Sequence, residues 1–320
     1  MTRSISYFEA IFEAEREEMT RDERVFLIVE DLALYEKTGL LPGFGPNRVR
    51  SAPISENGFV GMAVGAALTG LRPIVDLTIS SFCFVTADQL VSQAAKSRYM
   101  FGGQADVPLV VRSAMWHGGS NAAHHSDRPY PMFMNVPGLK IAVPATPYDA
   151  KGLLKSAVRD DDPLLLFEDK NLWFRPGPVP EEDYVVPLGV ANVVREGRDV
   201  TLVAIGSTVA PALEAAEVLA AEGCSAEVID PRSLVPLDTR AILESVARTG
   251  RLVVVDLANK TCGAAAEIAA ITAEEAFDAL TAPIVRVTTP DVPIPFSPPL
   301  EEPLYPNAAR IVAAVRRVLV

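Results

Sequence analysis

Three histidines lie close together in the sequence. His117, His124 and His125 fall within the segment WHGGSNAAHHSD, which follows an apolar run expected to form a strand. Imidazole changes its charge near neutral pH, and open α/β sheets bind ligands at the carboxyl ends of their strands. The segment is therefore a candidate site for proton transfer. The pattern is equally consistent with a solvent-exposed or locally hydrogen-bonded loop.

A carboxylate and two aromatic residues form a second group of candidates. Glu56 lies in APISENGFVG, just before an expected helix, while Phe82 and Phe84 lie in SSFCFVTADQL after an expected strand. A carboxylate at a helix N-terminus is stabilised by the helix dipole without any catalytic duty, and physical grounds alone favour this structural explanation. Alternating aromatic residues after a strand usually belong to the core.

The elements that must position these residues alternate between strands and helices. Apolar and β-branched runs predict strands at 25–29, 73–77, 107–111, 140–143 and 164–167, with helices at 59–68, 87–99 and 149–158. The alternation resumes with strands at 200–205, 226–229, 252–255 and 284–287, and with helices at 209–222, 239–249, 264–277 and 307–319. Continuously apolar strands separated by helices indicate parallel sheets covered on both faces. We expect the α/β class, with two three-layer α/β domains and mainly parallel sheets.

Proline marks the expected boundary between the domains. Four prolines and several charges lie between Phe174 and Gly189 without an apolar period, which is typical of a linker. We expect domains at residues 1–175 and 190–320, joined by a linker at 176–189. Apolar residues at helical spacing among the carboxylates of 5–19 predict an amphipathic surface helix. The proline-dense stretch 290–306 is expected to lie extended over a surface.

Composition excludes several classes of protein. The 320 residues carry 29 Lys and Arg against 41 Asp and Glu, a net charge of -12, so no nucleic-acid partner is expected. Three widely spaced cysteines argue against a disulfide framework and fit a reducing cytosol. The longest apolar stretch falls short of the ~20 residues of a membrane span, and a cytoplasmic location is expected. The motifs G-x-G-x-x-G, G-x-x-x-x-G-K-[ST] and G-x-S-x-G are absent, which argues against dinucleotide enzymes, P-loop NTPases and serine hydrolases.

Four longer motifs resemble one family. They are APISENGFVGMAVGAALTGLRPIVDL, ADQLVSQAAKSRYMFGGQADVPLVVR, VPGLKIAVPATPYDAKGLLKSAVRDDDP and AEVIDPRSLVPLDTRAILESVARTGRLVVVD, in collinear order over nearly the whole chain. Together they resemble the beta subunit of thiamine-diphosphate-dependent 2-oxoacid dehydrogenases of the pyruvate, branched-chain and acetoin type, within the transketolase-like superfamily. The resemblance implies a pyrimidine-binding domain followed by a transketolase C-terminal-like domain, and an oxidoreductase activity shared with a second subunit.

The resemblance assigns roles to three candidate residues. It implies that Glu56 meets the aminopyrimidine ring nitrogen of thiamine diphosphate, because protonation of that nitrogen lets the neighbouring amino group remove the thiazolium proton. Phe82 matches the position whose ring stacks on the pyrimidine. His125 matches the active-site histidine of the family's H-S-Q motif, where this chain has His125-Ser126-Asp127. The carboxylate of Asp127 only accepts hydrogen bonds, whereas the amide of glutamine also donates them. We expect this change to affect the neighbouring histidine or the contacts with the acyl acceptor.

The resemblance also implies ions and partners. Some family members hold a structural potassium ion with a loop whose equivalents here are Leu109, Ala157, Val158, Asp160 and Asp162; a plain acidic turn is the alternative. The family binds magnesium and the cofactor diphosphate with a G-D-G motif, which is absent here. We therefore expect an alpha subunit to supply the magnesium site, in a heterotetramer of two alpha and two beta chains. The other expected partners are a 2-oxoacid substrate and a lipoyl-bearing acyltransferase, with no nucleic acid and no membrane.

Three further functions remain open. With the same cofactor and site, the chain could serve a split transketolase or pass an acyl group to a carrier-protein thiol. It could also be a noncatalytic assembly subunit. The presence of Glu56, Phe82 and His125 together argues against an assembly role, since a scaffold has no need of them.

Overall fold

The computed structural model describes residues 2–319, and these divide into two compact units. The first unit comprises the chain up to Trp116 together with Met132–Leu188, and the second comprises His117–Pro131 together with the chain from Gly189 onwards. We call residues 117–131 the histidine loop. By its contacts this loop belongs to the second unit, although it is inserted in the sequence of the first.

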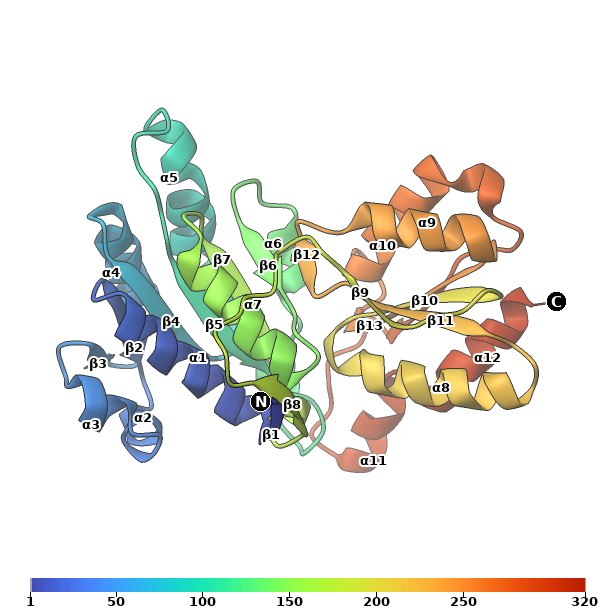
Figure 1. The fold of residues 1–320 in the computed structure, drawn as a ribbon, viewed down its shortest axis with the longest axis horizontal. Helices are drawn as coiled ribbons and strands as arrows, with labels where there is room; N and C mark the ends of the chain where they lie inside the picture. The colour runs from blue at the N-terminus through green and yellow to red at the C-terminus, as the bar shows by residue number, and fades with distance from the viewer. Residues whose placement is uncertain (1, 320) are drawn as a thin grey trace. The chain divides into compact units, whose positions relative to one another are not determined.

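A parallel sheet forms the centre of the first unit. Its strands are β2 (Val25–Val29), β3 (Val49–Ser51), β4 (Arg72–Ile79), β5 (Val110–Met115), β6 (Lys140–Ala142) and β7 (Leu164–Asp169). Within this unit the strand order is β6-β7-β5-β4-β2-β3, and neighbouring strands run parallel (Figure 1). The residues of β2, β5 and β7 are all buried, as expected for strands of a sheet covered on both faces.

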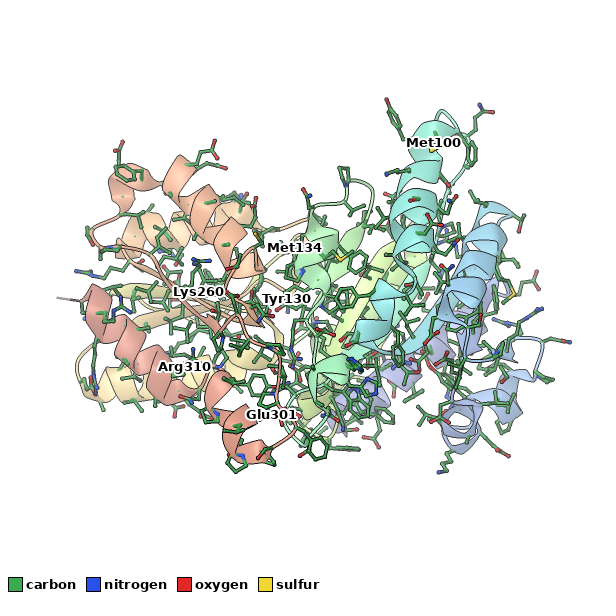
Figure 2. All side chains as sticks on the ribbon, turned by 180° about the vertical axis from the view of Figure 1, so that it is seen from behind. Met100, Tyr130, Met134, Lys260, Glu301 and Arg310 are labelled. Atoms are coloured by element: carbon green, nitrogen blue, oxygen red, sulfur yellow. The ribbon has the colours of Figure 1, made fainter. Side chains whose placement is uncertain are left out.

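Helices pack on both faces of this sheet. They are α1 (Tyr7–Arg21), α2 (Leu32–Lys37), α3 (Leu40–Phe44), α4 (Glu56–Leu68), a π-helical segment (Asp88–Ala94) that continues into α5 (Ala95–Met100), and α7 (Pro147–Arg159). A short helix, α6 (Tyr130–Met134), begins within the last two residues of the histidine loop. α1 and α7 lie side by side on one face, and α4 lies with α5 on the other, as the two opposite views show (Figures 1 and 2).

The helix expected at the surface near the N-terminus, α1, buries carboxylates that its local pattern places in solvent. Glu18 of α1 is fully buried and pairs with Arg159 of α7 at 2.6 Å. Lys151 and Lys155, also on α7, both contact Glu17. Glu9, Arg16, Thr20 and Arg21 are exposed, so the predicted amphipathic surface helix is confirmed. The burial of its other carboxylates was not predicted, because the cations that neutralise them lie 134 to 141 residues later in the sequence.

The stretch expected as a linker is partly structured. β8 (Pro176–Pro180) pairs antiparallel with β1 (Thr2–Ser6) in a two-stranded sheet. Its prolines occupy alternate positions, so the missing N–H groups fall on one side of the strand, where an edge strand needs no donor. Beyond it, Val186 is buried in the core of the first unit, and its N–H group donates to the carbonyl of Gly152.

The second unit is also an α/β structure. Its strands are β9 (Asn192–Arg195), β10 (Val200–Ala204), β11 (Ala226–Asp230), β12 (Ser233–Val235), β13 (Leu252–Asn259) and β14 (Val285–Thr289). The main sheet has the order β14-β13-β10-β11-β9, with β9 antiparallel and the others parallel. α8 (Val209–Ala221) and α12 (Ala308–Val318) cover one face, and α9 (Thr239–Thr249) and α10 (Ala264–Glu275) cover the other (Figure 1). The predicted class, two α/β units with mainly parallel sheets, is confirmed.

The proline-dense stretch before the last helix is not extended throughout. It contains α11 (Pro298–Glu301), followed by a 3-10 turn at Glu302–Leu304. The expectation of an extended chain was wrong here because proline is tolerated in the first turn of a helix, where its missing N–H group has no intrahelical partner to lose. Glu301, at the end of α11, is fully buried.

Candidate active site

The carboxyl ends of three neighbouring strands gather candidate residues at one edge of the first unit. Glu30 directly follows β2, Glu56 opens α4 after β3, and Phe82 lies in the 3-10 helix Ser80–Phe84 after β4. β4, β2 and β3 are adjacent and parallel. Because parallel strands end at the same edge of a sheet, these residues lie in the region where open α/β sheets bind ligands.

Glu56 lies at the N-terminus of α4. Its side chain is buried, with 8% of the residue exposed, and no side chain caps this helix end. The helix dipole and the free N–H groups of the first turn stabilise a carboxylate at this position. The geometry therefore agrees both with the catalytic role and with the structural explanation, and the surroundings of Glu56 must distinguish them.

Glu30 is an acidic neighbour that the sequence analysis missed. Its Oε1 atom is buried and has no hydrogen-bond partner among the described residues. Burial, with the negative charges of Glu56 and Asp76, raises the pKa of the Glu30 carboxyl group. A buried oxygen without a donor, close to a second carboxyl group, suits a ligand that presents N–H groups or a basic nitrogen. The sequence held one signal for it, a carboxylate directly after an apolar strand.

Phe82 and Phe84 differ in their surroundings. Phe82 is half-buried, between Ser81 and Cys83, which are both buried. Phe84 is 45% exposed, so the structural explanation that both rings belong to the core does not hold for it. The ring of Phe82 lies at the same sheet edge as Glu56, where an aromatic face can stack on a flat heterocycle.

The backbone oxygens expected to hold potassium lie between α7 and β7 and beside β5. The carbonyl of Leu109 accepts a hydrogen bond from the N–H group of Leu164 at 2.9 Å, which places Leu109 next to the loop. The carbonyls of Val158 and Asp160 both accept hydrogen bonds from Nη1 of Arg72, at 2.9 Å each. Each of these oxygens has a second lone pair, but a monovalent cation bound through the carbonyls of Val158 and Asp160 would share them with the positively charged guanidinium of Arg72.

The acidic side chains of the same loop have partners of their own. The carboxylates of Asp160 and Asp162 contact Nζ of Lys140 at 2.7 and 3.1 Å. The carbonyl of Ala157 accepts a hydrogen bond from the N–H group of Asp160 at 3.3 Å. Any cation here would therefore be held by backbone oxygens rather than by carboxylates.

His125 closes a short 3-10 turn in the histidine loop. The turn spans Ala123–His125, and His125 is half-buried while His124 is exposed. Nδ1 of His125 lies 3.0 Å from the carbonyl oxygen of His124. A carbonyl can only accept, so this contact assigns the proton of the neutral ring to Nδ1 and makes Nε2 the basic nitrogen.

The residues after His125 line a pocket in the second unit. Its volume is about 550 Å³, and its lining includes Ser126, Asp127, Arg128, Asp291 and Tyr305. Nη1 of Arg128 donates to the carbonyl of Ser126 at 2.7 Å. Groups of both charges line this pocket, so it suits a polar ligand.

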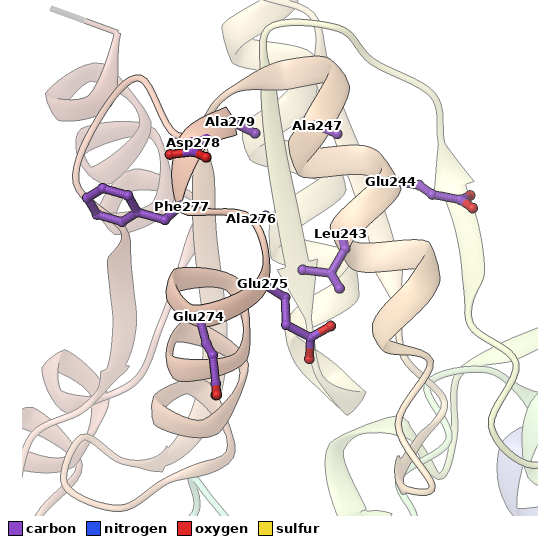
Figure 3. Close-up of a pocket in the computed structure, with 9 residues that line it drawn as sticks. All are labelled: Leu243, Glu244, Ala247, Glu274, Glu275, Ala276, Phe277, Asp278 and Ala279. Atoms are coloured by element: carbon purple, nitrogen blue, oxygen red, sulfur yellow. The ribbon is translucent and has the colours of Figure 1, made fainter.

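Another pocket of the second unit contains none of the predicted site residues. It has a volume of about 470 Å³ and lies between α9 and α10 (Figure 3). Its lining includes four carboxylates and no cation, and Phe277 beside them is 70% exposed. Four carboxylates with no cation among them would repel an anionic ligand.

Two structural features are absent from residues 2–319. No helix in this part of the chain is long and apolar enough to cross a membrane. No group of three or more His, Cys, Asp or Glu side chains within the same residues is arranged to hold a metal ion.

Comparison with known proteins places both units. Residues 3–174 match the transketolase pyrimidine binding domain, and residues 189–311 match the transketolase C-terminal domain. The chain is 47% identical to the acetoin:2,6-dichlorophenolindophenol oxidoreductase subunit beta of Bacillus subtilis, over 100% of this chain and 98% of that protein. It is 42% identical to the 2-oxoisovalerate dehydrogenase subunit beta of Bacillus subtilis, over 98% of both chains. It is 43% identical to the pyruvate dehydrogenase E1 component subunit beta of Rickettsia felis, again over 98% of both.

A solved structure shares the architecture of the whole chain. It is a split gene transketolase, described as an inactive beta4 tetramer, with a TM-score of 0.83 and 26% sequence identity. The match covers 98% of both chains.

Proposed function

The chain belongs to the transketolase-like family that includes the beta subunits of acetoin, 2-oxoisovalerate and pyruvate dehydrogenases, and on that premise we propose that it is the beta subunit of a thiamine-diphosphate-dependent 2-oxoacid dehydrogenase. The end-to-end match to these subunits carries the proposal. With an alpha subunit, the chain would decarboxylate a 2-oxoacid and transfer the acyl group to the lipoyl domain of an acyltransferase. Residues 1–175 would form the pyrimidine-binding domain and residues 190–320 the C-terminal domain, with 176–189 between them.

An alpha subunit is needed for the cofactor diphosphate. The chain contains no G-D-G motif, and the described residues contain no cluster of metal-ligating side chains. The magnesium and diphosphate site would therefore come from a partner, in a heterotetramer of two alpha and two beta chains. The split transketolase with the same architecture is inactive as a beta4 tetramer, which agrees with this requirement.

Glu56 and Phe82 would bind the aminopyrimidine ring. Thiamine diphosphate, when bound, would supply a nucleophilic carbon and a thiazolium ring able to take up the electron pair left when a 2-oxoacid loses carbon dioxide. One oxygen of the Glu56 carboxyl group would share a proton with a ring nitrogen, while the Phe82 ring would stack on the pyrimidine. The buried, unpartnered Oε1 of Glu30 supports this assignment, because it offers a second acceptor at the same edge.

His125 would act on the substrate side. Its neutral ring carries the proton on Nδ1, so Nε2 can accept a hydrogen bond or a proton from the reacting group. Asp127 replaces the glutamine of the family's motif and adds a negative charge two residues away. This charge would disfavour acidic acceptors.

Potassium would stabilise the loop after α7. The backbone oxygens of Leu109, Ala157, Val158 and Asp160 would hold it, with Asp162 contributing its backbone. Thermal unfolding of the assembled enzyme in potassium chloride and in choline chloride at equal ionic strength tests this. A melting temperature several degrees higher in potassium is expected, and equal values would contradict the site.

Acetoin is a second candidate substrate. The two relatives named for acetoin are 47% and 46% identical to this chain, whereas relatives named for 2-oxoacids are 41% to 43% identical. Both substrates carry a carbonyl group next to the bond that breaks, so the same residues would serve either. The leaving group differs, since a 2-oxoacid loses carbon dioxide and acetoin loses acetaldehyde.

Reconstitution with an alpha subunit tests the function. The isolated chain is expected to bind thiamine diphosphate weakly and to show no turnover, and the alpha subunit should restore both. Carbon dioxide release from pyruvate and branched-chain 2-oxoacids, and acetaldehyde release from acetoin, are measured with 2,6-dichlorophenolindophenol as electron acceptor. Full activity of the isolated chain would contradict the requirement for a partner.

The acyl acceptor is identified in the same preparation. Lipoyl domain, aldose phosphate and carrier-protein thiol are offered in turn to the reconstituted pair. Transfer to the lipoyl domain is expected. Transfer only to a sugar phosphate would indicate a split transketolase, and transfer only to the thiol a biosynthetic enzyme. An assembled pair that turns over none of the substrates would indicate an assembly subunit.

A further inference from the structure

Glu301 is a buried acid that the proposed chemistry does not use. It lies at the end of α11, in the proline-dense stretch, and is fully buried (Figure 2). A carboxylate out of contact with water is costly unless donors surround it. Here the donors come from the histidine loop, which lies more than 170 residues earlier in the sequence.

The carboxylate of Glu301 holds the backbone of the histidine loop at two points. The N–H group of Gly118 donates to its Oε1 at 2.8 Å, and the N–H group of Ser120 donates to its Oε2 at 3.2 Å. Hydrogen bonds to an ionised acceptor are stronger than those between neutral groups. Glu301 therefore fixes the segment that leads into the turn containing His125.

The segment held by Glu301 has an unusual backbone. Gly118, Gly119, Ser120 and Ala122 have φ values of 67°, 87°, 63° and 57°. Left-handed conformations cost free energy for residues with a side chain, and Ala122, with ψ of -170°, lies in a region that essentially only glycine adopts. Such a conformation persists only where surrounding contacts determine it, and the Glu301 carboxylate provides two of them.

Tyr305 completes the anchor. Its hydroxyl group donates to Oε1 of Glu301 at 3.0 Å. Its ring packs edge-on against His117 with centroids 5.1 Å apart, and the guanidinium of Arg128 lies 6.0 Å from the ring centre. Tyr305 therefore contacts the loop before and after His125.

A separate contact fixes the end of the loop. The hydroxyl group of Tyr130 donates to Oδ1 of Asp256, which is fully buried on β13. Asp256 also accepts the N–H groups of Ala258 and Ala265, at 2.9 and 3.2 Å. With this end fixed, the Glu301 contacts determine the course of the loop up to the turn at His125.

We infer that Glu301 and Tyr305 are positioning residues, which hold His125 in its working place by bonding the backbone of residues 118–120 and packing against residues 117 and 128. The inference rests on the proposed function for its effect on turnover, but the anchoring itself can be tested without any activity. The proline-dense stretch would thus position a residue of the active site, a role that its sequence does not indicate.

Glu301→Gln is the central variant. Glutamine keeps the shape but has one acceptor oxygen, and its NH₂ group would face a backbone donor. Tyr305→Phe removes one hydrogen bond and keeps the ring. Glu302→Gln is the matched control, because Glu302 is the next residue and is exposed.

The variants are compared in the reconstituted pair by steady-state kinetics and by amide hydrogen exchange. For Glu301→Gln we expect kcat to fall about 10–100-fold, as for a displaced catalytic group, with KM changed less than about threefold. Tyr305→Phe should show a smaller fall in kcat, and Glu302→Gln none. Exchange in Glu301→Gln should accelerate within residues 117–131 while the strands of the second unit keep their protection.

Three results would overturn the inference. They are an unchanged kcat in Glu301→Gln, unchanged exchange in the histidine loop, and accelerated exchange throughout the second unit, which would mark a general loss of stability. If the wild-type pair turns over none of the offered substrates, the proposed function fails. The exchange of residues 117–131 then decides the anchoring alone.

Discussion

Glu15→Gln is expected to remove a pH dependence from the stability of the first unit. Glu15 is fully buried and lies 3.2 Å from Arg112, whose guanidinium also contacts Asp76 and both oxygens of Glu168. One positive charge thus faces three carboxyl groups, and Oε2 of Glu15 has no hydrogen-bond partner among the described residues. Burial, opposed by the attraction of Arg112, raises the pKa of Glu15 from 4.5 to about 8. The folded chain therefore keeps this group protonated at neutral pH.

The sign and size of the effect follow from this pKa. Below pH 4.5 the carboxyl group is protonated in both the folded and the unfolded chain, and its contribution to stability is fully present. As the pH rises towards 8, only the unfolded chain releases the proton, so the free energy of unfolding falls by about 1.4 kcal/mol per pH unit. Between pH 6 and pH 8 the loss is about 2 kcal/mol, which corresponds to about 4–8 °C in melting temperature.

Thermal unfolding of the full chain at pH 6 and pH 8 measures this loss. Glutamine stays neutral in both states, so the melting temperature of Glu15→Gln should rise relative to the wild type by about 4–8 °C as the pH changes from 6 to 8. Other titrating groups cancel in this difference. The control is Glu23→Gln, at an exposed position, which should follow the wild type at both pH values. Identical pH dependence in the wild type and Glu15→Gln would refute the reasoning.

Three other substitutions or reagents test the packing. Arg112→Met leaves the buried carboxyl groups around it without a cation, so it should lower the free energy of unfolding, measured with denaturant, by about 3–5 kcal/mol. A loss below about 1 kcal/mol would mean that these carboxyl groups do not depend on the cation. Gly138→Ala should lower the free energy of unfolding by about 2–4 kcal/mol, because φ of Gly138 is 98° and the new Cβ atom would clash with the carbonyl oxygen of Ala95. Burial raises the pKa of the Cys83 thiol to about 12. At pH 8 this thiol should therefore react with maleimide at least roughly 100-fold more slowly than the exposed Cys262. Labelling is measured by mass spectrometry, and equal labelling of the two cysteines would contradict the burial of Cys83.

Local apolar runs allowed much of the fold to be predicted. The strand at 25–29 and the helix at 239–249 have the predicted bounds, because each is a continuous pattern of short range. β8 was missed because its prolines resemble a linker, and only pairing with β1 makes it a strand. The burial of carboxylates on α1 was also missed, since charge pairs with distant residues of α7 do not appear in a local pattern.

The candidate site was predictable only in part. Glu56 and Phe82 were identified through resemblance, and the structure places both at the edge where the parallel strands of the sheet end. Glu30 has a weak local signal, and its relevance depends on lying near Glu56. The anchoring of the histidine loop could not be predicted, because Gly118 and Glu301 are 183 residues apart and a carboxylate among prolines gives no sign that it will be buried.

The most direct test of the account is the exchange of the thiazolium C2 proton of bound thiamine diphosphate in the reconstituted pair. The exchange rate in deuterated buffer is followed by NMR after acid quenching, for the wild type, for Glu56→Gln and for a control at the exposed residue Glu36. The account predicts a rate about 10²–10⁴-fold lower in Glu56→Gln, with cofactor bound and the control unchanged. Exchange at the wild-type rate in Glu56→Gln would contradict it.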